Sequence, residues 1–150
     1  MKFLKNTLRV TITSILVSMI LFGYVHSEDR IIGKWLTNDE EVIIEIFKKG
    51  DEYFGRLDWM EEAYDPDGSK KVDDKNPDGE KQERLLEGLV VLSSFTYEGD
   101  DKWSNGTIYN PNTGRTYDAY IKLDDDKLNV RGYIGFAFLG RTEVASRVEQ

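Results

Sequence analysis

The chain has 150 residues, of which 20 are Lys or Arg and 28 are Asp or Glu, so its formal net charge is −8. This length supports one domain with a single hydrophobic core and is too short for two. The absence of Cys excludes disulfides, thiol nucleophiles and Cys-ligated zinc, and the acidic balance argues against binding to nucleic acid, whose phosphates need a basic surface.

The first 27 residues have the three-part composition of a secretory signal peptide. Three basic residues are the only charges before Glu28, and the uncharged apolar run 10–22 follows them. That run is too short to cross a membrane, which takes about 20 apolar residues. The segment ends in the small residue Ser27, so we expect cleavage between Ser27 and Glu28 and no membrane-spanning segment after it.

Cleavage there would leave 123 residues with a formal charge of −11, because three basic and no acidic residues would be removed. His26, the sole histidine, would be lost as well. Without His or Cys, the Ser-His-Asp and Cys-His mechanisms and His-built zinc sites lack their components. We therefore expect the mature protein not to be an enzyme and to need no cofactor.

The rest of the chain alternates between apolar and polar residues, a pattern typical of β-strands with one buried face. In 53–59, for example, Tyr53, Leu57 and Trp59 share one face. Short turns rich in Gly, Asn and Asp separate such segments. Eight strands are predicted, at 32–36, 42–47, 53–59, 89–97, 102–109, 115–123, 127–134 and 138–148.

Strands joined by tight turns pair with their sequence neighbours in an antiparallel meander. Eight such strands with one apolar face can close on themselves, which buries that face and leaves no free sheet edge. The predicted fold is therefore all-β, a single eight-stranded antiparallel up-and-down β-barrel over 28–150. An open two-sheet sandwich is the alternative.

One segment, 61–84, is too long for an ordinary turn and is rich in Pro, Gly and Asp. We expect it to fold over one barrel mouth and to end in a short helical turn over 79–86. Its adjacent acids Asp73 and Asp74 are expected to form a solvated face rather than a catalytic pair. The stretch 74–79 matches the first half of a calcium loop, but the twelfth position is Leu85 instead of Glu, so we expect no metal site.

Six longer motifs follow one another along the chain. They are GKWLT at 33–37, DDKNPD at 73–78, GTIYNP at 106–111, GRTY at 114–117, LNVRGYIG at 128–135 and LGRT at 139–142. In this combination the chain resembles a family of small secreted bacterial domains of unknown function with a lipocalin-like, calycin-type β-barrel. The resemblance covers about 32–148 and implies an exported protein of the bacterial periplasm.

The Gly-x-Trp motif at the first predicted strand is also similar to that of lipocalins and fatty-acid-binding barrels. In those proteins the Trp lies at the closed end of the barrel beneath an Arg of the last strand. The resemblance implies this barrel-closing role for Gly33, Trp35 and Arg147. The chain departs from the family pattern at Ala145, where a Trp is usual. Either a Phe from 136–138 fills the freed space, or the interior is roomier there.

The side chains predicted to face inward can form either a ligand pocket or an ordinary core, since an eight-stranded barrel is just wide enough for both. Arg131, Arg141 or Arg147 could bind a ligand carboxylate, or could instead cap Trp35 or form surface ion pairs. The candidate pocket residues are Tyr53, Leu57, Trp59, Leu89, Val91, Phe95, Trp103, Tyr117 and Arg131.

Two functions are consistent with these patterns. The first is an exported binding protein that holds a small apolar or lipid-like, amphipathic ligand in its barrel, with 61–84 gating the mouth. The alternative is a filled barrel whose acidic surface binds a cationic protein partner. A continuous internal cavity favours the first function and a packed barrel favours the second.

Overall fold

The computed structural model describes residues 27–135 and 140–149. The chain divides into two units, 1–30 and 31–150. In the first unit only the start of the short 3₁₀-helix η1 (Ser27–Ile31) is described, so the predicted signal segment up to residue 26 lies outside the described residues. No helix in the described ranges is both long enough and apolar enough to cross a membrane.

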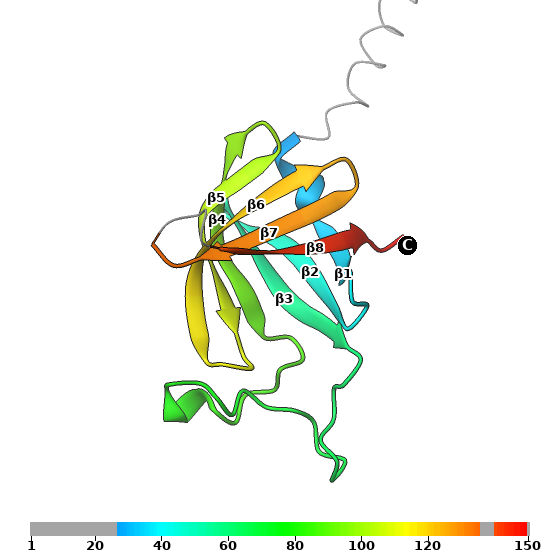
Figure 1. Cartoon of the computed structure of the whole chain (residues 1–150), viewed down its shortest axis with the longest axis vertical. Helices are drawn as coiled ribbons and strands as arrows, with labels where there is room; N and C mark the ends of the chain where they lie inside the picture. Colours follow the sequence, from blue (N-terminus) through cyan, green and yellow to red (C-terminus); the bar gives the residue numbers. More distant parts are fainter. Residues whose placement is uncertain (1–26, 136–139, 150) are drawn as a thin grey trace, which may run out of the picture. The chain divides into compact units, whose positions relative to one another are not determined.

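The second unit is a closed barrel of eight antiparallel strands (Figure 1). Each strand pairs with its neighbour in sequence, and the last pairs back with the first through Trp35 and Arg147, Leu36 and Ser146, and Thr37 and Ala145. This closure confirms the predicted up-and-down barrel and excludes the open sandwich. The strands are β1 (Gly33–Thr37), β2 (Val42–Lys49), β3 (Glu52–Met60), β4 (Val90–Gly99), β5 (Lys102–Asn110), β6 (Arg115–Asp124), β7 (Lys127–Tyr133) and β8 (Arg141–Arg147).

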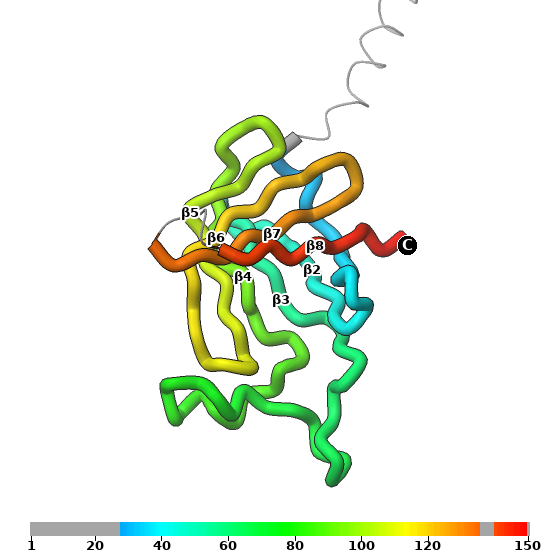
Figure 2. Tube along the Cα trace, in the orientation of Figure 1, coloured from blue at the N-terminus to red at the C-terminus, as the bar shows by residue number. Residues whose placement is uncertain are grey.

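The strand connections alternate between two ends of the barrel (Figure 2). At one end lie the tight turns at 50–51, 100–101 and 125–126 together with the start of β1; we call this the closed end. At the other, the open end, lie the β1–β2 turn, the β5–β6 turn and the connection 61–89 between β3 and β4, which we call the long loop. The long loop contains the predicted helical turn as the 3₁₀-helix η2 (Gly79–Lys81).

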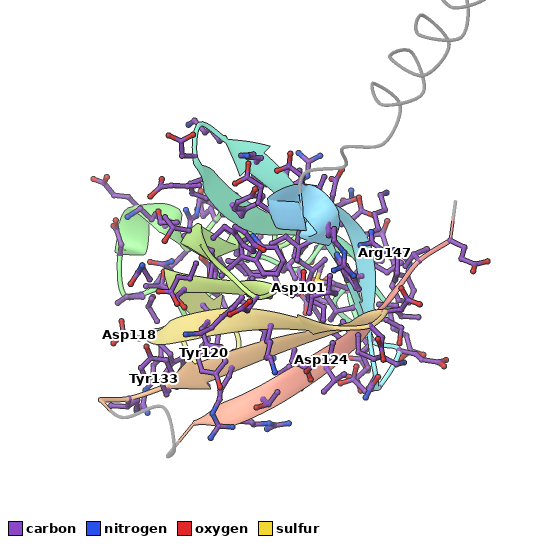
Figure 3. All side chains as sticks on the ribbon, turned by 90° about the horizontal axis from the view of Figure 1, so that it is seen from above. Asp101, Asp118, Tyr120, Asp124, Tyr133 and Arg147 are labelled. Atoms are coloured by element: carbon purple, nitrogen blue, oxygen red, sulfur yellow. The ribbon has the colours of Figure 1, made fainter. Side chains whose placement is uncertain are left out.

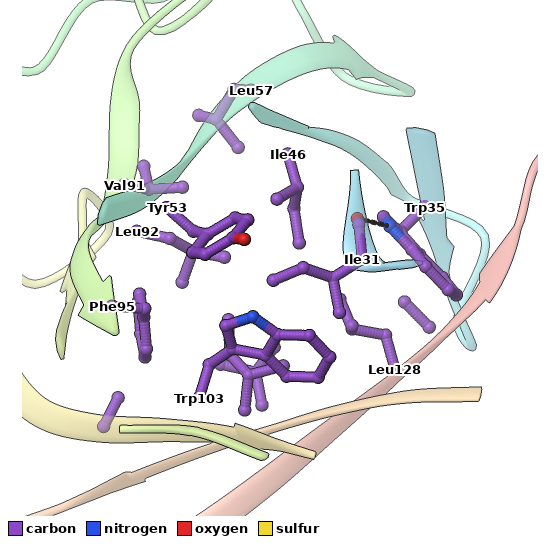
Figure 4. Packing of buried hydrophobic residues seen from close by; sticks show 14 of the residues in the cluster. Ile31, Trp35, Ile46, Tyr53, Leu57, Val91, Leu92, Phe95, Trp103 and Leu128 are labelled. Atoms are coloured by element: carbon purple, nitrogen blue, oxygen red, sulfur yellow. Dashed lines mark hydrogen bonds between the residues drawn. The ribbon is translucent and has the colours of Figure 1, made fainter. Parts of the chain in front are cut away.

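Large side chains fill the barrel toward its closed end (Figure 4). Tyr53 and Trp103 meet edge to face, with ring centroids 6.2 Å apart, and Phe95 is buried with them. The buried Trp35 indole donates its N–H to the Ile31 carbonyl at 2.8 Å, so its polar group is satisfied. This half of the barrel is a packed hydrophobic core.

An arginine reinforces the backbone ladder at the seam between β1 and β8. The guanidinium of Arg147 lies 4.2 Å from the centre of the Trp35 ring, a cation–π contact, and its Nη1 donates to the Ile32 carbonyl at 3.1 Å. Gly33 has φ 130°, and a Cβ there would lie 3.0 Å from Arg147 Nη1. Gly33, Trp35 and Arg147 thus occupy the positions that the resemblance assigns to them.

A β-bulge in β3 reverses the side-chain alternation near the open end. Leu57 and Trp59 pair with successive residues of β2, so Asp58 is an extra residue without a partner in that ladder. Beyond the bulge Met60 faces the interior, and Trp59 is 45% exposed on the outside. The prediction that Trp59 lines a pocket was therefore wrong, because strict alternation does not continue through the bulge.

Candidate binding site at the open end of the barrel

An apolar cavity of about 240 Å³ occupies the open half of the barrel, and we call it the main cavity. Every strand except β6 contributes to its walls, and the long loop contributes Leu86. Most of the wall residues are aliphatic, and the aromatic residues Trp35 and Tyr109 complete the wall. Representative wall residues are Val42, Ile44, Leu57, Val91, Leu128 and Val130.

Ala145 is part of this wall. It is buried on β8, directly opposite Leu128 of β7, and both residues line the main cavity. Directly opposed residues of a ladder share one face, so the Ala145 methyl group faces the interior. The small side chain leaves room that a larger one would fill. The aromatic residues considered as substitutes, at 136 and 138, lie outside the described residues.

Two further hollows adjoin the main cavity. The first, the side hollow, has about 630 Å³ and shares Ile108, Asn110, Val130 and Glu143 with the main cavity. The second, the rim hollow, has about 240 Å³ and shares Val42, Met60, Leu86 and Asn112 with it. A ligand in the main cavity can therefore extend toward either of two more polar neighbouring spaces.

An ion pair on β8 lies at the edge of this interior, with the Arg141 side chain 88% exposed and the Glu143 side chain 50% exposed. Glu143 lies opposite Val130, and Arg141 lies opposite Gly132, so all four residues are on the inward face of β7 and β8. Arg141 Nε lies 2.6 Å from Glu143 Oε1. Glu143 lines both the main cavity and the side hollow, and Arg141 lines the side hollow only.

The rim hollow is acidic. Of the residues that the structure describes, its lining includes the acids Glu41, Glu61 and Glu62 and one basic residue, Lys71. Lys71 Nζ lies 3.1 Å from Glu62 Oε2 and so neutralises one of the three carboxylates. Glu41 and Glu61 are held together by a backbone hydrogen bond of 2.8 Å from the Glu61 amide to the Glu41 carbonyl. The open end thus carries an excess of negative charge beside an apolar cavity.

A buried carboxylate organises the long loop. Asp73 is fully buried and accepts hydrogen bonds from Tyr109 Oη at 2.6 Å, from Asn76 Nδ2 at 2.8 Å and from Arg84 Nη2 at 2.8 Å. Burial alone would raise the pKa of Asp73, but the bonds from Tyr109, Arg84 and Asn76 and the charge of Arg84 outweigh it and hold the pKa below its ordinary value. Since Tyr109 also lines the main cavity, this cluster joins the loop to the cavity wall.

This cluster corrects the expectation that Asp73 is solvated; only its neighbour Asp74, paired with Lys75 at 2.6 Å, lies at the surface. Burial, followed by the bond to Asp73 and its negative charge, raises the pKa of Tyr109. The half-matched calcium motif serves the loop itself, because Asn76 Oδ1 accepts from the Asp78 amide at 2.9 Å. Within 27–135 and 140–149, no three His, Cys, Asp or Glu side chains are grouped so that they could hold a metal.

The remaining candidate pocket residues divide into two groups. Leu57 and Val91 line the main cavity, and Tyr117 lines the side hollow. The others lie away from these spaces: Leu89 is buried without lining any of the three hollows, and Tyr53, Phe95 and Trp103 belong to the packed closed end. Pocket and core residues have the same alternation, so the sequence pattern could not separate them.

Arg131 lies outside the barrel. It pairs in the ladder with Tyr120, on the outer face, where the Tyr120 and Tyr133 rings lie 6.4 Å apart across β6 and β7 (Figure 3). Its Nη1 donates to Thr142 Oγ1 at 2.8 Å. The candidate role of Arg131 as an interior ligand receptor is therefore corrected, because its ladder position puts it on the opposite face from Val130. Arg141, not Arg131, borders the hollow interior.

A closed eight-stranded up-and-down barrel, packed at one end and hollow at the other, is a lipocalin-like barrel. The chain belongs to the family described as "uncharacterized protein conserved in bacteria (DUF2147)", whose model matches residues 33–147.

A solved structure described as "Protein HP1028 from the human pathogen Helicobacter pylori belongs to the lipocalin family" is similar to this chain. The identity is 24%, the match covers 79% of this chain and 83% of that one, and the TM-score is 0.67. This likeness shows a shared lipocalin-like fold. No match was found among curated proteins.

Proposed function

We propose that this protein is an exported bacterial binding protein, without catalytic activity, that holds a small apolar or amphipathic molecule in the open half of its barrel. The observation that carries the proposal is the main cavity, an apolar space of about 240 Å³ that adjoins two more polar hollows. An apolar cavity of about 150 Å³ in an engineered lysozyme accepts benzene, so this one has room for a larger apolar group. The lipocalin-like fold is compatible with such binding.

The alternative function, a filled barrel that binds a cationic protein, receives less support. It requires a fully packed interior, whereas this barrel contains an apolar cavity of about 240 Å³. The acidic open end favours a positively charged binding partner in either case, whether that partner is a small molecule or a protein.

The ligand-binding proposal is tested by titration with the neutral fluorescent probe N-phenyl-1-naphthylamine. We expect the unaltered protein to bind the probe, and Ala145→Phe to bind it about tenfold more weakly or not at all, because the ring fills the main cavity. Thr142→Phe is the matched control, since it adds the same ring to the exposed outer face of β8 and should leave binding unchanged. The absence of probe binding to the unaltered protein, or equal binding by Ala145→Phe, would refute a ligand cavity.

Export requires a separate test. We expect the protein expressed from its full-length sequence in a bacterium to be recovered from the periplasm, and N-terminal sequencing to begin at Glu28. Retention in the cytoplasm with an uncleaved N-terminus would contradict the exported location and would leave the cavity proposal in place.

A further inference from the structure

We infer that the ligand of the main cavity is an amphiphile with a cationic head group, such as a primary alkylamine, and that Glu143 binds this head group. The inference rests on the proposed function and adds the ligand's chemical class to it. Three observations carry it: the position of Glu143, the arrangement of its ion pair, and the charge around the three hollows.

Glu143 is placed between apolar and polar surroundings. Among the described residues it is the one charged side chain that lines the main cavity, whose walls are otherwise apolar or neutral. It also lines the side hollow, and its side chain is half exposed. A head group at the boundary of the two spaces would therefore meet the Glu143 carboxylate while its alkyl chain fills the main cavity.

The ion pair leaves one carboxylate oxygen for a ligand. Arg141 Nε contacts Oε1, and the structure shows no other polar contact of the Glu143 side chain within the described chain. Because Arg141 contacts Oε1, Oε2 can accept a hydrogen bond from an ammonium group. An anionic head group aimed at Arg141 would instead approach the Glu143 carboxylate.

The charged side chains around the hollows also favour a positively charged ligand. Among the described residues, four carboxylates, of Glu41, Glu61, Glu62 and Glu143, line the three hollows, against two basic side chains. These are Lys71 and Arg141, and each already pairs with one of the acids. The resulting field attracts a cationic head group and repels an anionic one, and the formal net charge of −8 acts in the same direction.

The test compares three ligands with the same alkyl chain: dodecylamine, dodecanoate and dodecanol. Each displaces N-phenyl-1-naphthylamine from the purified protein at neutral pH and low ionic strength, below its micelle-forming concentration. We expect dodecylamine to bind about tenfold more tightly than dodecanol, the size of one charge-assisted hydrogen bond, and dodecanoate to bind most weakly. Added salt should weaken dodecylamine binding and leave dodecanol unaffected.

Charge-removing variants then assign the head group to a residue. Glu143→Gln should remove the preference for dodecylamine over dodecanol. Glu149→Gln, an exposed acid beyond β8 at the closed end, makes the same chemical change away from the cavity and should have no effect. Arg141→Gln should preserve or strengthen dodecylamine binding.

Tighter binding of dodecanoate that is lost in Arg141→Gln would overturn the cationic-ligand inference and leave the proposed binding function standing. So would a dodecylamine preference that survives in Glu143→Gln. If neither the probe nor any of the three ligands binds, the proposed function itself fails. The two failures are therefore distinguished in one set of titrations.

Discussion

At the scale of single residues, Asp73 is the feature on which the open end most depends. Its carboxylate is fully buried, and a buried charge is tolerated only when it is paired and hydrogen-bonded. Its partners Asn76 and Arg84 come from the long loop, and Tyr109 comes from β5. One side chain therefore links two segments that are far apart in the sequence.

The lowered pKa of Asp73 means that the stability of the protein should depend on pH. Its pKa in the folded protein lies below the ordinary value of 3.8, so the unfolded chain takes up a proton first as the pH falls. The stabilisation is thus complete above the ordinary pKa and is lost as the pH falls through the folded pKa. We expect Asp73→Asn to cost about 2 kcal/mol at neutral pH, because Arg84 loses its charged partner and the cluster loses acceptor strength.

The measurement is urea unfolding of both proteins between about pH 5 and about pH 2. The unaltered protein should lose more stability than Asp73→Asn over this range, so that the two free energies of unfolding converge. The other acids are the same in both proteins. Their contributions therefore cancel when the two free energies of unfolding are subtracted. Two parallel curves would mean that the Asp73 carboxylate does not stabilise the folded state through its charge.

Residue-level roles were the hardest to predict from the sequence. Asp73 follows a Lys-rich, polar stretch and precedes another acid, so nothing in its neighbourhood distinguishes it from a solvated loop residue. The only signal was its place in the DDKNPD motif, which occurs in the same family pattern as the motif that contains Tyr109. Burial of Asp73 is created by a contact across the fold, and such a contact leaves no local pattern.

At the scale of structural elements, the long loop is attached to the β5–β6 turn at Gly114. This glycine has φ +67°, and a Cβ at its position would lie 1.9 Å from the Lys75 carbonyl oxygen. Only a residue without a side chain lets the loop backbone come so close. The long loop is thus a packed part of the open end rather than a free connection.

Gly114→Ala is therefore expected to displace the long loop. Gly50→Ala is the matched control, because Gly50 has φ +64° and no atom would lie within 4 Å of its Cβ. The control should cost only left-handed backbone strain, about 1 kcal/mol, and Gly114→Ala should cost about 2 kcal/mol more. Urea unfolding measures both costs, and faster proteolytic cleavage within 61–89 should occur in Gly114→Ala alone. Equal costs would show that the Lys75 contact does not hold the loop.

The elements themselves were predictable because each strand carries its own period-two pattern. Seven of the eight predicted strands match the observed ones to within a few residues at each end, and the eighth begins at Arg141 with 138 and 139 outside the described residues. The bulge at Asp58 was not predictable, since an extra residue in a strand looks like any other in the sequence. That one residue is the reason why Met60 and not Trp59 lines the main cavity.

At the scale of the whole barrel, closure depends on the β1–β8 seam. Arg147→Leu removes the cation–π contact with Trp35 and the hydrogen bond to the Ile32 carbonyl. We expect a loss of about 1–2 kcal/mol, with faster hydrogen exchange concentrated in β1 and β8. Arg115→Leu, at the exposed start of β6, is the control and should change neither quantity. Unchanged exchange in Arg147→Leu would mean that the backbone ladder alone closes the barrel.

The closed barrel itself was predictable because eight half-apolar strands have few other ways to bury their inner faces. Its division into a packed half and a hollow half was not, since Leu57 in the hollow half and Tyr53 in the packed half belong to the same alternating pattern. The difference arises from the sizes of the side chains that meet across the interior. The register between strands determines which side chains come together across the interior. That register cannot be read from the sequence of one strand.

The extra residue at Asp58 has a consequence for the evolution of such barrels. Deletion of this one codon would remove the bulge, but Trp59 and Met60 would keep their ladder partners Ile43 and Val42, and so their outward and inward orientations. The bulge thus accommodates one additional residue in β3 without changing which side chains line the main cavity. Homologous barrels that differ by one residue at this point of β3 can therefore keep the same cavity wall.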